Sequence, residues 1–388
     1  MRGHIRKRGA RSWAVVLDLG RDHRGHRKQK WHTIQGTKSD AERELARLLH
    51  EINTGGYVAP TKMSVEDYLE RWLSDGARSR VSPKTFERYT DIVRGHLVPR
   101  LGHIPLAKLT PLDIQGHYTW ALTEGRRDGR GGLSKQSVVP HHRILNRALR
   151  QAVRWQLIAR NPVDAVESPR PDTCPIRALN ESETFLLLKA AENSRLYPVI
   201  LLAVTTGMRR GELLALKWNA VDLERKSLSV FESLEQTRDT LRFKRPKSAK
   251  GQRKIDLLRL AEEELRHHRA RQREHKLLLG PAYADHDLVF PEPDGTLWAP
   301  DKLTRAFAAL VRRHGLEGLR FHDLRHSHAT QLLRQGVHPK VVSERLGHAT
   351  VSITLDLYSH VLPGMQKEAA ERLDAALRIA RAKDMTSD

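Results

Sequence analysis

The stretch from Ser168 to Pro175 breaks the chain into two parts. It contains Pro169, Pro171 and Pro175 within eight residues. Proline fixes its own φ, has no backbone N–H and keeps the preceding residue out of the helical region. A helix or a central strand therefore cannot run through this stretch, and such a composition is typical of an interdomain linker. Because 388 residues suffice for two or three cores, we expect a linker at residues 169–179 with separate domains on either side.

Residues 1–60 predict a small sheet followed by one helix. Strands are expected at residues 4–7, 12–19 and 29–35, where β-branched and aromatic side chains lie between polar, Gly-containing loops. Ser39 and Glu42 have the spacing of a capping box, which predicts the start of a helix that ends at Gly55. A hinge through Ala59-Pro60 would follow.

Residues 61–168 predict a helical domain. Ser64 with Asp67, Ser82 with Pro83, and Thr110 with Pro111 are helix starts, because a capping side chain comes before an acidic residue or a proline. A fourth helix is expected from about Ser134 towards Leu157. Residues 180–388 are expected to form helices at 181–192 and 196–206, a strand-rich region at 227–257, and further helices. The predicted fold class is multidomain and mainly α with small β-sheets.

The charge of the chain favours nucleic acid as a partner. Lys and Arg number 68 against 46 Asp and Glu, a net charge of +22 that is shared among the three predicted domains. No apolar run approaches a membrane span, and residues 1–11 lack the apolar core of a signal peptide. Cys174 is the only cysteine, which excludes an intramolecular disulfide and fits a reducing bacterial cytosol. We therefore expect no membrane partner.

Four short segments bring together residues that suit phosphate chemistry. They are Thr-Gly-Met-Arg-Arg-Gly-Glu-Leu at 206–213, Arg-Phe-Lys-Arg-Pro-Lys-Ser at 242–248, His-Asp-Leu-Arg-His at 322–326, and a final segment from Leu-Gly-His at 346–348 to Tyr358. In this order and spacing, with the tyrosine ten residues after His348, the chain resembles the tyrosine recombinases, the family of the phage integrases. The resemblance covers residues 180–362 closely and the helical segment before them more loosely. Residues 1–60 resemble the arm-binding domains of integrases from phages and integrative elements.

The resemblance implies a reaction and a set of catalytic residues. These are Arg209, Lys247, His322, Arg325, His348 and the nucleophile Tyr358, with Glu212 orienting the site. Guanidinium groups and other fixed donors stabilise the charge that builds on a phosphodiester during displacement. A phenol with a pKa of about 10 needs nearby positive charge or a base to become a nucleophile. The broken bond's energy stays in a 3′-phosphotyrosyl link, so no cofactor, ATP or metal is expected.

Several alternatives stay open. Lys244 or Lys250 could replace Lys247 as the general acid of the predicted hairpin. His322, His326 and His328 could be read as a metal cluster, which we disfavour because no carboxylate or cysteine has the expected spacing. Residues 351–358 have strand propensity, whereas the resemblance places Tyr358 on a helix, which we follow. A last helix after Pro363-Gly364 would pack on its own domain or on a neighbouring protomer.

The resemblance also implies partners. We expect double-stranded attachment-site DNA, a homotetramer on two DNA sites, and a DNA-bending host factor and an excision factor. DNA contacts are expected from Arg6, Lys7, Arg8, Arg11, Lys28, Lys30, Lys244, Arg245 and Lys250. Two competing functions stay open. A type IB topoisomerase or a telomere resolvase would use the same chemistry, whereas a DNA-binding regulator would bind DNA without catalysis.

Overall fold

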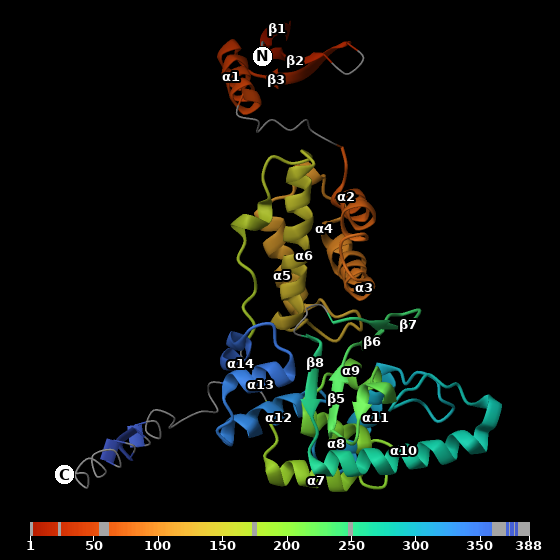
Figure 1. Cartoon of the computed structure of the whole chain (residues 1–388). Coiled ribbons are helices and arrows are strands. Elements are labelled where there is room, and N and C mark those ends of the chain that lie inside the picture. Colours follow the sequence, from red (N-terminus) through yellow and green to blue (C-terminus); the bar gives the residue numbers. More distant parts are fainter. Residues whose placement is uncertain are drawn as a thin grey trace. The chain divides into compact units, whose positions relative to one another are not determined.

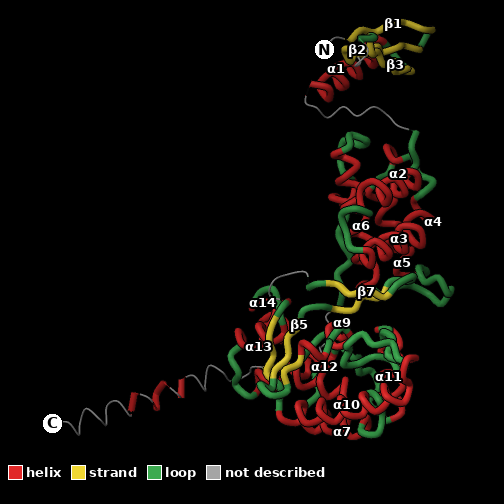
Figure 2. Tube along the Cα trace, turned by 45° about the vertical axis from the view of Figure 1, so that its right-hand side comes forward, coloured by secondary structure: helices red, strands yellow, loops and turns green. Residues whose placement is uncertain are grey.

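The computed structural model of the chain describes residues 3–21, 25–53, 62–172, 177–246 and 251–358, with short helical stretches at 370–371, 373–375 and 377–378. The chain divides into two compact units, Met1–Thr173 and Cys174–Asp388. Helices dominate both units and the strands form small separate sheets (Figures 1 and 2). The expected fold class, mainly α with small sheets, is confirmed.

The first unit begins with a three-stranded antiparallel sheet. The strands β1 (Gly3–Gly9), β2 (Ser12–Arg21) and β3 (Arg27–Gln35) lie in the order β1-β2-β3, and α1 (Lys38–Asn53) packs on one face. Val15 and Leu17 of β2 are fully buried against that helix. The sheet and helix are as expected, but the cap is not. Asp40 N bonds to Thr37 Oγ1 and Thr37 N to Asp40 Oδ2, at 3.3 and 2.8 Å, because the helix starts at Lys38 and Ser39 already lies inside its first turn.

A helical bundle with its own apolar core follows in the same unit. Its helices are α2 (Val65–Arg71), α3 (Pro83–Ile92), α4 (Val98–Leu101), α5 (Pro111–Thr123) and α6 (Lys135–Arg154), with π-helical turns at Trp72–Ala77 and Val93–Leu97 and 3₁₀ turns at Leu106–Lys108 and Pro162–Ala165. Ser64, Ser82, Thr110 and Ser134 cap their helices as the sequence predicts. The predicted helix starts in this part of the chain are therefore confirmed.

Helix α8 (Tyr197–Thr206) is central to the second unit. Its sequence is apolar on every side, and every residue from Pro198 to Thr206 is buried. A helix that is apolar all round needs neighbours on all sides. Here α8 packs against α7 (Glu181–Ala191), α10 (Arg259–Leu279) and α12 (Asp323–Arg334). These contacts fix the place of its C-terminal end, where the first sequence motif begins.

Short strands and helices surround this core. The strands β4 (Val221–Asp222), β5 (Ser227–Val230) and β8 (Arg253–Asp256) form one antiparallel sheet, while β6 (Ser233–Gln236) and β7 (Leu241–Lys244) form the expected hairpin. The remaining helices are α9 (Arg210–Leu214), α11 (Pro300–Arg313), α13 (Pro339–Leu346) and α14 (Val351–Tyr358), with 3₁₀ turns at Trp218–Ala220 and Gly280–Ala282. Residues 351–358 are thus helical, as the family resemblance predicts.

Parts of several expectations lie outside the described residues. These parts are the helix end at Gly55 with the hinge at Ala59-Pro60, residues 173–176 of the linker, Lys247 and Lys250 of the hairpin region, and most of the C-terminal helix, including Met365 and Ala380. Leu373 and Leu377 of that segment are described and are exposed.

Candidate active site

The first motif is a tight turn between α8 and α9. Gly207 ends α8 with a φ of +66°, in the left-handed region that favours glycine. A Cβ at this position would lie 2.5 Å from Leu346 Cδ2 and 2.7 Å from His328 Cδ2. The turn therefore lies against α13 and α12, and it delivers Arg209 to the N-terminus of α9. The Arg209 side chain is 42% exposed, so its guanidinium can reach a ligand.

Glu212 lies between two guanidinium groups. Its Oε1 accepts a hydrogen bond from Arg209 Nη1 at 2.8 Å, and its Oε2 accepts one from Arg253 Nη2 at 2.8 Å. Burial alone would raise the pKa of Glu212, but the hydrogen bonds and charge of Arg253, together with Arg209, bring the net pKa below its ordinary value. The ionised carboxylate thus holds Arg209 in place and offsets part of the local positive charge.

Arg325 occupies the interior of the site. Its Nη1 donates to Gly207 O and its Nη2 to Leu346 O, both at 2.8 Å. These carbonyls belong to the ends of α8 and α13, so one guanidinium joins two of the sequence motifs. Burial and the charge of Arg209 lower the pKa of Arg325 to about 9, which still leaves it protonated at neutral pH.

The two motif histidines lie close to these arginines. His322 precedes α12, and burial of its ring together with His326, Arg325 and Arg209 lowers its pKa to about 4, although part of its side chain is exposed. His348 follows Gly347, which ends α13 with a φ of +67°. The His348 Nδ1 bonds to Thr354 Oγ1 at 2.8 Å. Burial and the charges of Arg325 and Arg209 lower its pKa to about 4, so both rings are neutral at pH 7.

Tyr358 ends α14 and is 1% exposed. Its ring packs in an apolar cluster with Ala329, Leu333, Val342 and Leu346. Its hydroxyl forms a 2.6 Å hydrogen bond with His326 Nδ1. Burial raises the pKa of Tyr358 to about 12, although the charge of Arg325 acts in the opposite direction. In this arrangement the phenol keeps its proton at neutral pH.

The structure brings five of the six expected catalytic residues into one region and does not place the sixth. Lys247 lies outside the described residues, and so does its alternative Lys250. The other alternative, Lys244, donates a 2.8 Å hydrogen bond to Glu235 Oε1 within the hairpin. That pair occupies Lys244, whereas Arg245 is exposed.

Three residues outside the expected catalytic set also bond to residues of the site. Arg253 pairs with Glu212, and its Nε also donates to Arg345 O at 2.7 Å. Arg345 Nε in turn donates to His328 Nε2 at 3.0 Å. His326 contacts the Tyr358 hydroxyl. For His326 a signal was present in the sequence: it follows His322 by four residues, one helical turn.

The expected DNA-binding residues of the N-terminal sheet lie on both of its faces. Arg6 and Arg8 stand over the ring of Trp31, 5.7 and 5.3 Å from its centroid, and Trp31 is 46% exposed. Trp31 pairs with Val16, on the face opposite α1. Lys7 and Lys30 pair with Trp13 and Leu17, which face α1. Arg11 is exposed at the β1–β2 turn, and Lys28 lies in β3.

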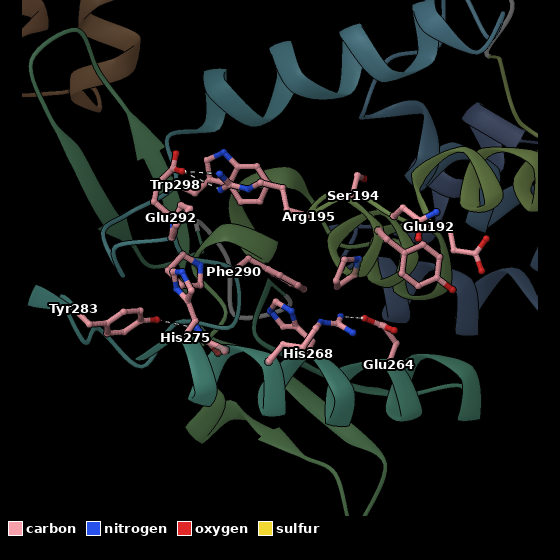
Figure 3. Close-up of a pocket in the computed structure, with 17 residues that line it drawn as sticks. Glu192, Ser194, Arg195, Glu264, His268, His275, Tyr283, Phe290, Glu292 and Trp298 are labelled. Carbon is pink, nitrogen blue, oxygen red and sulfur yellow. Dashed lines mark hydrogen bonds and ion pairs between the residues drawn. The ribbon is translucent and has the colours of Figure 1, made fainter. Parts of the chain in front are cut away.

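A pocket of 690 Å³ elsewhere in the second unit is lined by none of the expected catalytic residues (Figure 3). It lies among α10, residues 192–198 and residues 283–298. Arg195 bonds to Glu292 at 2.9 Å and stacks on Trp298, and Gln272 bonds to the Tyr283 hydroxyl at 3.2 Å. The residues of the four sequence motifs lie outside the lining of this pocket. We do not assign the reaction to this pocket.

Within the described ranges no group of three or more His, Cys, Asp or Glu side chains is arranged to hold a metal ion, and this includes His322, His326 and His328. None of the helices in the same ranges has both the length and the apolar character that a membrane crossing needs.

Known proteins match the chain over most of its length. The phage integrase family matches residues 177–364, and the N-terminal SAM-like domain of phage integrases matches residues 64–119. A tyrosine recombinase XerC-like protein of Caldanaerobacter subterraneus subsp. tengcongensis is 29% identical over 387 residues, which cover 95% of this chain and 97% of that protein.

Two solved structures share the fold. One is the Tn1549 transposon integrase in complex with a circular intermediate DNA, with a TM-score of 0.66 and 22% identity over 80% of this chain and 99% of that one. The other is a lambda integrase tetramer bound to a Holliday junction, with a TM-score of 0.55 and 20% identity over 90% of this chain and 96% of that one.

Proposed function

The chain belongs to the phage integrase family, and from this premise we propose that it is a site-specific DNA recombinase that integrates or excises a mobile element. The observation that carries the proposal is the convergence of three distant segments, which contain Arg209, Arg325 and Gly347, on one region. Gly207 and Leu346 both accept hydrogen bonds from Arg325, and Arg209 bonds to Gly347 O at 3.4 Å.

Arg209 and Arg325 are proposed to stabilise the pentavalent phosphate. Guanidinium groups hold phosphate oxygens by paired hydrogen bonds, and they gain strength where water is excluded. His322 and His348 supply further donors from the N–H of their neutral rings. Glu212 touches no DNA in this scheme. It keeps the Arg209 guanidinium in its orientation.

Tyr358 is proposed to attack the scissile phosphorus and form a 3′-phosphotyrosyl link. The leaving 5′ oxygen receives a proton from Lys247, which is the residue of the hairpin region that matches the family motif. The covalent link conserves the energy of the broken bond, so that a 5′ hydroxyl from a partner strand can reverse the step. Because Tyr358 is buried here, attack requires that it become accessible when DNA binds.

The DNA partners are proposed from the fold and from the structural relatives. We divide the chain into an arm-binding domain at 1–60, a core-binding domain at 61–168, a linker at 169–179 and a catalytic domain at 180–388. The open face of the N-terminal sheet, with Arg6, Arg8 and Trp31, would contact arm DNA, and Arg245 would contact core DNA. By analogy with the lambda integrase tetramer, the working assembly is a homotetramer on two sites in the bacterial cytosol, helped by bending and excision factors.

A nicked attachment-core duplex tests the proposal, since loss of a short strand traps the covalent complex. The wild-type protein should accumulate an adduct that survives denaturing electrophoresis. Tyr358→Phe should form none while it binds the same DNA, because only the nucleophilic oxygen is lost. Recombination between two sites by the wild type distinguishes the recombinase from a topoisomerase. Adduct formation by the Phe variant would refute the assignment.

A further inference from the structure

We propose that His326 is a further catalytic residue, the base that accepts the phenolic proton of Tyr358. The inference rests on the proposed function, because it takes Tyr358 as the nucleophile. It assigns a role to a histidine outside the expected set of Arg209, Lys247, His322, Arg325 and His348.

The contact between the two side chains is direct. The Tyr358 oxygen lies 2.6 Å from His326 Nδ1, and the two ring centroids are 5.8 Å apart. A general base must lie within hydrogen-bond distance of the proton that it removes. Among the described residues, His326 is the hydrogen-bond partner of the Tyr358 oxygen. The Nδ1 atom of His348 instead bonds to Thr354. His326 is therefore better placed than either motif histidine.

The surroundings of His326 keep its ring neutral at pH 7. Burial lowers its pKa, Asp323 opposes that shift, and Arg325 and Arg320 add to it. His322, on the preceding turn, stands edge-on at 5.0 Å between ring centroids. In the tautomer with the proton on Nε2, the Nδ1 lone pair is free to accept the phenol proton.

The buried Tyr358 phenol needs a base to remove its proton. Burial raises the pKa of Tyr358 to about 12, so very little phenolate exists at neutral pH. The nearby positive charge of Arg325 does not offset that burial. A hydrogen-bonded acceptor removes the proton only as the new bond forms, and such assistance contributes about 10²–10⁴-fold in rate.

The Tyr358 oxygen forms a bond to phosphorus while its proton moves to His326 Nδ1, which leaves an imidazolium. The bond from phosphorus to the 5′ oxygen breaks, and that oxygen takes a proton from Lys247. In the reverse step Lys247 recovers its proton from the attacking 5′ hydroxyl, and His326 returns its proton to the departing Tyr358 oxygen. No oxidant, metal or further reactant is needed.

Two substitutions separate proton transfer from mere positioning. His326→Ala removes the side chain, and His326→Asn keeps a polar group near the Nδ1 position but cannot take a proton at neutral pH. Single-turnover adduct formation on the nicked duplex should slow by about 10²–10⁴-fold in both variants, with DNA binding unchanged. His314→Asn, at an exposed histidine that follows α11, is the matched control and should keep the wild-type rate.

Two measurements show whether the His326 variants have lost a base. Added imidazole should restore His326→Ala in proportion to the unprotonated imidazole concentration, because it can fill the vacated space. A substrate with sulfur in place of the leaving 5′ oxygen needs no proton on departure. It should relieve the defect of Lys247→Ala and leave that of His326→Ala unchanged.

The results that would overturn the inference differ from those that would overturn the proposed function. Wild-type rates in His326→Asn, or rescue of His326→Ala by the sulfur substrate, would show that His326 is not the base while Tyr358 remains the nucleophile. An adduct formed by Tyr358→Phe would remove the nucleophile and the proposed function together. Circular dichroism at matched temperature confirms that each variant is folded.

Discussion

Glu212 and Arg253 form a two-point ion pair in the interior, with Oε1–Nη1 and Oε2–Nη2 distances of 3.2 and 2.8 Å and side chains only 4% and 6% exposed. The same carboxylate holds Arg209. A buried pair of this kind joins the β8 strand to the turn that presents Arg209. The orientation of Arg209 therefore depends on a pair of side chains that is almost fully buried.

Removal of Glu212 should destabilise the second unit strongly. Glu212→Ala leaves the buried Arg253 charge without its partner, which costs about 3–5 kcal/mol in the free energy of unfolding. Glu263→Ala removes an exposed ion pair with Arg259 in the same unit and should cost less than about 1 kcal/mol. Urea unfolding of both variants measures the difference, and equal costs would contradict the role assigned to the buried pair.

Gly207 should not tolerate a side chain. Ala at a φ of +66° costs about 1–2 kcal/mol, and its Cβ would also meet Leu346 and His328 at 2.5 and 2.7 Å, adding about 1–3 kcal/mol of overpacking. Gly336 has a φ of +78° and open space around it. In thermal unfolding, Gly336→Ala should therefore lose only the free energy that a side chain costs in the left-handed backbone region. A Gly207→Ala variant as stable as Gly336→Ala would refute the close approach.

Acid should loosen the helical bundle. Burial lowers the pKa of His117 to about 4 and that of His141 to about 3, and their rings bond to each other at 3.2 Å. Both stay neutral in the fold, whereas the unfolded chain binds protons below pH 6.5. Stability should thus fall as the pH drops from 7.5 to 5.0, by about 2 kcal/mol for each histidine.

Amide hydrogen exchange in α5 and α6 at the two pH values measures this loss of stability. His117→Gln should reduce it by about half. His103→Gln, at an exposed position, should leave it unchanged. A loss of stability that is the same in all three proteins would rule out the buried histidines as its cause.

The N-terminal sheet should account for part of the salt dependence of DNA binding. Residues 1–38 carry eleven Lys and Arg against two Asp, and each phosphate contact changes the logarithm of the binding constant by about 0.9 per logarithmic unit of salt. Deletion of 1–60 should flatten the dependence and remove footprints outside the core. Replacement of Arg6 and Arg8 by Ala should lower the slope by about 1.8, whereas Lys38→Ala, on α1, should not. Unchanged footprints after the deletion would contradict an arm-binding domain.

Local patterns in the sequence predicted much of the fold. Proline and capping side chains mark helix starts by their own chemistry, so Ser64, Ser82, Thr110 and Ser134 were recognisable without tertiary information. The cap of α1 was misplaced at Ser39 because Thr37 with Asp40 has the same three-residue spacing. Val351–Tyr358 forms a helix despite its β-branched residues, because packing against α13 outweighs propensity.

The site was only partly predictable. The family resemblance predicts Arg209, Arg325 and Tyr358 as site residues, because each belongs to a short sequence motif. The pairing of Tyr358 with His326 depends on α14 lying against the α12–α13 pair, a relation between segments 32 residues apart. Arg253 lies 41 residues from Glu212, among several basic residues that the sequence alone does not distinguish. The burial of Tyr358 likewise arises from tertiary packing.

The most direct test of the account is the identity of the amino acid that carries the DNA. The adduct formed on a nicked core site can be digested with trypsin and nuclease, and its nucleotide-bearing peptide sequenced by mass spectrometry. We predict a 3′-nucleotide phosphate on Tyr358 in the peptide that also contains His348. An adduct on another residue such as Tyr283, or a 5′ linkage, would contradict the central claim.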